Sequence, residues 1–133
     1  MYEFTKGGVR ARDERVLERE EGAPGVARRF VAERFAEWGV SDEYDGRIIV
    51  SEFVTNALVH GEGRIVLRVF RDEVDGLPVI EVQDDGDLLP VVRPENFAAT
   101  CGRGLVMVAG LAREWGTRPL ADGGKVVWAK CGI

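Results

Sequence analysis

The sequence predicts an α/β (α+β) two-layer sandwich in which helices cover one face of a mixed, mostly antiparallel sheet. Two amphipathic helical segments come first, a pair of strand-like runs follows, and a third helix then leads into a closing hairpin. Consecutive strands joined by short turns pair antiparallel, and the helices bury their apolar stripes against one side of them. The length of 133 residues suits one such domain with a single core.

The first part of the chain is polar and charged, so we treat residues 1–22 as an N-terminal segment and residues 23–133 as the domain proper. The alternation of residues 15–19 predicts an edge strand within that segment. A first helix begins near Pro24, a residue favoured at the first helical position, and Gly39 ends it. Apolar residues at helical spacing between these ends predict one buried face.

The second helix follows Ser41, a good N-cap, and runs to about Val59, where glycines close it. Residues 64–70 and 79–83 are rich in β-branched side chains and are separated by turn residues, which predicts an antiparallel hairpin.

A third helix is expected to start near Gly102 and to bury an apolar stripe made of Leu105, Val108, Leu111 and Trp115. The chain then closes with a second hairpin, in which residues 115–120 pair with residues 125–130 across a glycine-rich turn.

Composition and charge exclude several classes of protein. Hydrophobic residues make up 45% and charged residues 31%, which is ordinary for a globular domain and not for a disordered chain. The net charge of -5 argues against a nucleic-acid partner. No apolar run approaches the roughly 18 residues of a membrane helix, and the start does not resemble a signal peptide. We therefore expect a cytoplasmic protein with free thiols and no zinc site.

The second helix carries a polar stripe. Glu52, Asn56 and His60 fall at positions i, i+4 and i+8, which stacks them on one face. Such a stripe is usually a solvated face, but Asn is a poor residue in the middle of a helix. An Asn amide oxygen is a hard ligand suited to Mg²⁺, and a Glu one turn earlier suits a general base. His60 is also explained by the helix dipole alone, because a cation is favoured at a helix C-terminus.

Two further motifs can serve a nucleotide. Asp84 and Gly86 form either a common strand-ending turn or a carboxylate that accepts a hydrogen bond from an exocyclic amine such as that of adenine. Two glycines before the third helix, at residues 102–105, form either a loose helix start or an anion site at the helix N-terminus. Neither the P-loop nor the Rossmann fingerprint fits these residues.

The three motifs in this order resemble those of the Bergerat-fold ATPases, the superfamily that includes gyrase and the histidine kinases. Within it, residues 23–130 resemble the anti-sigma factor serine/threonine-protein kinases of bacterial partner-switching systems. The resemblance implies a Bergerat-type, histidine-kinase-like ATPase domain that uses ATP and Mg²⁺. It also implies partners, namely an anti-sigma-factor antagonist and a sigma factor, and a homodimer.

The resemblance implies a role for each matching residue. Glu52 is expected to be the catalytic base, Asn56 the Mg²⁺ ligand, and Asp84 the acceptor for the adenine amine. The other nucleotide contacts are expected at Gly86 and, at the end of the lid, at Gly102, Arg103, Gly104 and Leu105. Leu88 stands where the family has a glycine, so a catalytically weak module that acts by binding alone is the alternative function.

Overall fold

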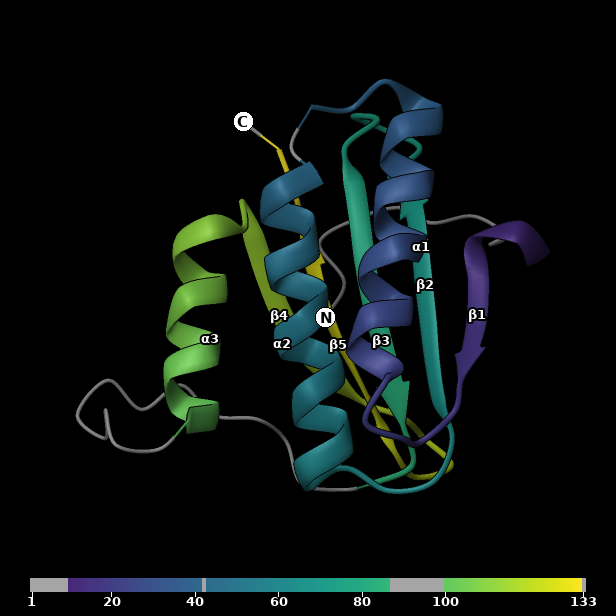
Figure 1. The fold of residues 1–133 in the computed structure, drawn as a ribbon, viewed down its shortest axis with the longest axis vertical. Coiled ribbons are helices and arrows are strands. Elements are labelled where there is room, and N and C mark those ends of the chain that lie inside the picture. Colours follow the sequence, from purple (N-terminus) through teal and green to yellow (C-terminus); the bar gives the residue numbers. More distant parts are fainter. Residues whose placement is uncertain (1–9, 42, 87–99, 133) are drawn as a thin grey trace.

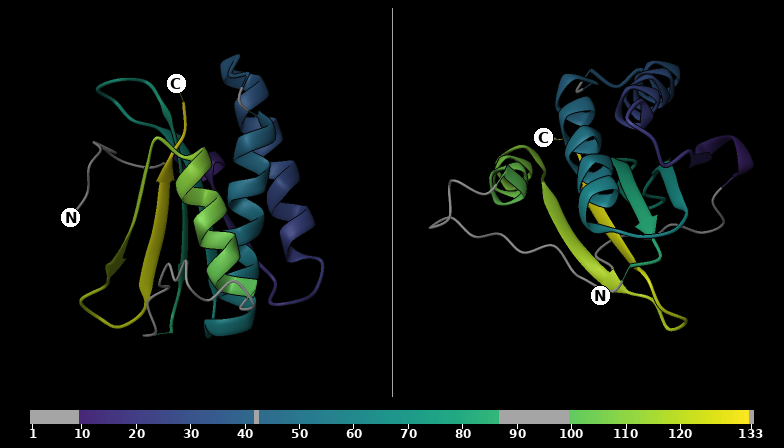
Figure 2. Two further views of the ribbon diagram at one scale, coloured as in Figure 1. Left: turned by 90° about the vertical axis from the view of Figure 1, so that its left-hand side faces the viewer. Right: turned by 60° about the horizontal axis from the view of Figure 1, so that its bottom comes forward.

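The computed structural model describes residues 10–41, 43–86 and 100–132, and for residues 100–105 only the course of the helix. Within these residues, α1 (Ala23–Trp38), α2 (Glu43–His60) and α3 (Thr100–Leu111) lie on one face of a five-stranded sheet (Figures 1 and 2). The strands are β1 (Glu14–Leu17), β2 (Ile65–Arg71), β3 (Pro78–Asp84), β4 (Glu114–Pro119) and β5 (Lys125–Lys130), and a short 3₁₀ turn, η1 (Ala11–Asp13), leads into β1. The predicted two-layer architecture is confirmed.

The strand order is β1-β2-β3-β5-β4, and every pairing described is antiparallel. The expected mixed sheet is therefore wrong in that detail. The segment β3-α3-β4 connects two strands that run in the same direction but are not neighbours, because β5 returns through the closing hairpin and lies between them. The two predicted hairpins and the predicted edge strand are confirmed.

The first helix begins and ends as predicted. Pro24 lies in the first turn, where its missing N–H leaves no hydrogen bond unmade. Gly39 adopts the left-handed conformation, with φ 70°, and its N–H donates to a carbonyl of the last turn. Among the described residues no helix is long and apolar enough to span a membrane.

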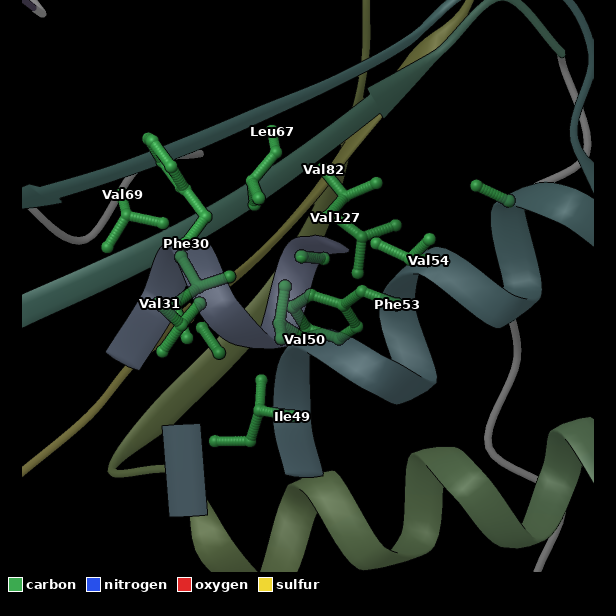
Figure 3. Close-up of a cluster of buried hydrophobic side chains, with 14 of the residues drawn as sticks. Phe30, Val31, Ile49, Val50, Phe53, Val54, Leu67, Val69, Val82 and Val127 are labelled. Carbon is green, nitrogen blue, oxygen red and sulfur yellow. The ribbon is translucent and has the colours of Figure 1, made fainter. Parts of the chain in front are cut away.

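The core lies between the helices and the sheet. The buried face of α2 consists of Gly46, Ile49, Val50, Phe53, Val54 and Ala57. Figure 3 shows Phe53 and Val54 in one cluster with Leu67 of β2 and Val127 of β5. The interior face of the sheet is thus apolar, and the opposite face of α2 is left for the polar stripe.

The third helix starts at Thr100, two residues earlier than predicted, and ends at Leu111. Val108 is buried and Leu111 packs against the core as expected, whereas Trp115 belongs to β4. The side chain of Leu105 lies outside the described residues.

The close packing of α1 on α2 depends on Gly46. A Cβ atom there would lie 2.8 Å from the ring of Phe35, which is fully buried. We therefore expect Gly46→Ala to lower the free energy of unfolding by about 1–3 kcal/mol through overpacking. The matched control is Gly110→Ala in α3, where a Cβ atom meets nothing within 4 Å. That variant should gain up to about 1 kcal/mol from higher helix propensity.

Urea denaturation of both variants measures the difference. Equal stabilities of the two variants would contradict the close approach of α1 to α2 at this glycine.

Candidate functional site

One end of the domain gathers the motifs that the sequence singles out. The C-terminal ends of α2 and β3 lie at the lower end of the molecule in Figure 1, and the first turn of α3 begins there too. The helix α2 packs against both β3 and α3. Asp84, at the end of β3, therefore lies at the same end of the domain as Asn56, which is one turn before the end of α2.

The loop after α2 is tied to the turn after β3. The Asp85 N–H donates to the Glu62 carbonyl at 2.8 Å, and the Arg64 N–H donates to Asp85 Oδ2 at 3.0 Å. A Cβ atom on Gly61 would lie 2.6 Å from the carboxyl carbon of Asp84, so this loop approaches the carboxylate as only glycine allows. The glycines predicted to close α2 thus also position the Asp84 turn.

Asp84 is buried and ion-paired. Its Oδ1 accepts a hydrogen bond from the Gly86 N–H at 2.7 Å and one from Lys125 Nζ at 2.9 Å. The side chains of Asp84 and Lys125 are only 3% and 6% exposed. The hydrogen bond to Gly86 makes a strand-ending turn, which is one of the two interpretations of this motif. The binding role of both residues stays a prediction.

The sequence did not point to Lys125 as part of this site. The register of the sheet places Lys125 directly opposite Asp84 on the neighbouring strand β5. Gly124, which precedes it, adopts φ 87°, and a Cβ atom there would lie 2.6 Å from the Asp84 carbonyl oxygen. Both features depend on how β5 pairs with β3, which local patterns along the chain do not reveal.

The polar stripe of α2 lies as predicted, on the face away from the core. Glu52 and Asn56 are half-buried, and His60 is exposed at the helix end. Burial raises the pKa of the Glu52 carboxyl above its ordinary value. A raised pKa makes the carboxylate a better proton acceptor near neutral pH, which suits a general base.

Glu52 also forms part of the wall of a groove of about 320 Å³. We call this the helix groove, because Arg28 of α1 and Met107 of α3 line it together with one face of α2.

The segment expected to contact phosphates is helical and not a loop. Gly102, Arg103, Gly104 and Leu105 all lie within the first two turns of α3. Packing of the later part of α3 on the core outweighs the low helix propensity of two glycines. The side chains of these four residues, and the lid with Leu88, lie outside the described residues.

The residues near Asn56 fit an Mg²⁺ ion only if a bound nucleotide supplies some of its other ligands. Within the described part of the chain, no three His, Cys, Asp or Glu side chains come together as a metal cage. In nucleotide enzymes Mg²⁺ keeps several waters and takes one or two protein ligands besides phosphate oxygens. One half-buried Asn amide oxygen therefore suits an Mg²⁺ ion that arrives with a nucleotide.

Comparison with known proteins supports the resemblance. A family model described as the histidine kinase-like ATPase domain matches residues 17–131. The chain is also similar to the crystal structure of the RsbU and RsbW domains of Rv1364c from Mycobacterium tuberculosis, with 26% sequence identity and a TM-score of 0.66. That match covers 89% of this chain and 32% of the other. No curated protein sequence matches the chain.

The ion pair between Asp84 and Lys125 is open to a double-mutant cycle. Asp84→Asn and Lys125→Met each leave one buried group without its partner, and each should lower the free energy of unfolding by about 3–5 kcal/mol. The double variant should lose less than the sum of the two, with a coupling energy of up to about 3 kcal/mol. Additive losses in urea denaturation would show that the two residues do not interact.

Glu52 should make stability depend on pH. The folded-state pKa is raised above the ordinary value of 4.5, so folding favours the protonated form and stability falls as pH rises through the folded-state pKa. Glu52→Gln should therefore melt at a higher temperature than the parent at pH 7.5, and the difference should disappear at pH 4. The control is Glu33→Gln, at an exposed glutamate of α1. The same pH-dependent gain in both variants would exclude burial of Glu52 as its cause.

Proposed function

The chain belongs to the histidine kinase-like ATPase domain family, and we propose that it binds ATP with Mg²⁺ and phosphorylates a serine of an anti-sigma-factor antagonist. The observation that carries the proposal is the arrangement at one end of the domain. Glu52 and Asn56 share one face of α2, and the buried carboxylate of Asp84 lies at the same end as the first turn of α3.

In this proposal the nucleotide lies between α2, the end of β3 and the start of α3. Asp84 accepts a hydrogen bond from the adenine amine, and Gly86 lies beside the ring. The first turn of α3 offers backbone N–H groups that no helical carbonyl can use, and these suit phosphate oxygens. Arg103 supplies a cation near the same phosphates. Asn56 would hold Mg²⁺, which would neutralise charge on the phosphate oxygens.

Glu52 acts as the general base. It accepts the proton of the serine hydroxyl, the serine oxygen forms a bond to the γ-phosphorus, and the bond from that phosphorus to the β-phosphate oxygen breaks to release ADP. Four residues of α-helix rise by about 6 Å, so Glu52 stands one turn from Asn56 on the same face. The raised pKa of Glu52 supports this role, because it brings the carboxyl group closer to working pH.

We further propose that the protein sequesters a sigma factor as a homodimer in the cytoplasm, without nucleic acid or membrane partners. The similarity to a structure that contains an RsbW domain supports a partner-switching role. The aromatic residues of α1 give no support to a dimer surface on that helix, since Phe30 and Phe35 are in the core and Trp38 packs against it.

A second candidate function is a nucleotide-binding module that acts by binding alone. The observation that favours it is the ion pair of Asp84. Lys125 Nζ donates a hydrogen bond to Oδ1 of this carboxylate, which is the group expected to accept the adenine amine. The two functions differ in whether phosphate reaches a partner protein.

Two variants of α2 separate transfer from binding. Glu52→Gln should keep the ATP affinity within a few-fold and cut phosphotransfer by about 10²–10⁴-fold, since a base speeds transfer but contributes little to binding. Asn56→Ala should lose both transfer and the part of the ATP affinity that depends on Mg²⁺. Calorimetric titration of ATP with Mg²⁺ or with EDTA measures binding, and mass spectrometry of purified anti-sigma-factor antagonists measures transfer.

Transfer at the parent rate by Glu52→Gln would exclude Glu52 as the base. If the parent binds ATP but phosphorylates no acceptor, the module that acts by binding alone is the better description.

A further inference from the structure

The helix groove lies beside the proposed nucleotide site and shares Glu52 with the proposed catalytic machinery, whereas its other lining residues have no role there. Tyr44, Arg47, Ser51 and Glu52 line it from α2, at positions i, i+3, i+7 and i+8, which fall on one face of the helix. Figure 1 shows α2 flanked by α3 on one side and by α1 on the other. The groove therefore starts near the beginning of α2 and reaches Glu52, one turn before Asn56.

Two arginines give the groove positive charge. Arg28 Nη1 donates to Ser51 Oγ at 2.8 Å, which holds this side chain over α2. Arg47 Nε lies 3.5 Å from a Glu43 carboxylate oxygen and makes no hydrogen bond, while the Arg47 side chain as a whole is 43% exposed. A half-exposed arginine can still donate to an anionic or polar oxygen that enters the groove.

Two exposed side chains add aromatic and thioether surface to the wall. The side chain of Tyr44 is 68% exposed and that of Met107 is 48% exposed. Exposed aromatic and thioether side chains beside arginines are typical of surfaces that bind polypeptides. The carboxylate of Glu52 at the end of the groove disfavours a free phosphate ion there.

We propose that the helix groove binds the serine-bearing segment of the phosphoacceptor protein, and that Arg28 and Arg47 select acidic residues flanking the serine. This rests on the proposed kinase function. A segment lying along the groove brings its hydroxyl to Glu52, while the nucleotide approaches from the side of Asn56. Glu52 thus stands at the junction of the two substrates, and the arginines determine specificity without contacting the nucleotide.

The test uses two pools of fluorescein-labelled peptides with a central serine, one flanked by Asp and Glu and the other by Lys and Arg. Fluorescence anisotropy measures their binding to the full chain without nucleotide. The parent should bind the acidic pool at least about tenfold more tightly than the basic pool. R28E and R47E should each lose that preference.

The control is R29E, at an exposed arginine next to Arg28 on α1 that does not line the groove. It should keep the preference of the parent. Equal binding of the two pools by the parent would overturn the proposal. So would a loss in R29E as large as in R28E, because that would reflect net charge and not the groove.

A second measurement separates this proposal from the kinase function. R28E and R47E should bind ATP like the parent, which also shows that they fold, and with an antagonist protein their KM should rise more than their kcat falls. If the parent fails to bind ATP but prefers acidic peptides, the proposed function fails and the groove assignment stands. If the parent transfers phosphate and the KM of R28E and R47E is unchanged, the groove assignment fails and the function stands.

Discussion

The buried ion pair between Asp84 and Lys125 connects the parts of the molecule that form the candidate site. It links β3 to β5, and the same carboxylate oxygen accepts the backbone N–H that shapes the turn after β3. Gly61, in the loop after α2, approaches this carboxylate more closely than a side chain would allow. Two buried charges are stable only as a pair, so the sheet, the turn and the end of α2 are fixed together.

The helix α2 packs against the sheet and also carries the polar stripe, and these two roles conflict at Glu52. Its inner face packs against the sheet, and burial spreads far enough around the helix to desolvate Glu52. An ionised carboxylate in such a position lowers the free energy of unfolding, and proteins retain such residues where they serve catalysis or binding. The raised pKa of Glu52 and its position one turn from Asn56 are therefore consistent with a single functional explanation.

Much of the fold follows from local patterns, and much of the site does not. Strand-like runs separated by turn residues predict both hairpins, and the spacing of apolar residues predicts α1. The i, i+4 spacing places Glu52 and Asn56 on one face of α2. Local patterns do not identify Lys125 as a site residue, because its partner Asp84 lies 41 residues away in sequence and on a neighbouring strand. The helix α3 starts two residues earlier than the sequence predicts, because packing of its later residues outweighs the low helix propensity of its glycines. The helix groove is lined by residues of three helices, so it depends on tertiary packing that no single segment of the sequence reveals.

The position of β5 in the sheet also bears on the order in which the molecule folds. It is the last described strand along the chain, but it lies between β3 and β4. Until it pairs, the exposed edge of β3 is free to join another chain, and Asp84 has no cation beside it. Contacts between residues far apart in sequence form slowly. Pairing of β5 thus covers the edge of β3 and gives Asp84 its partner cation in the same step.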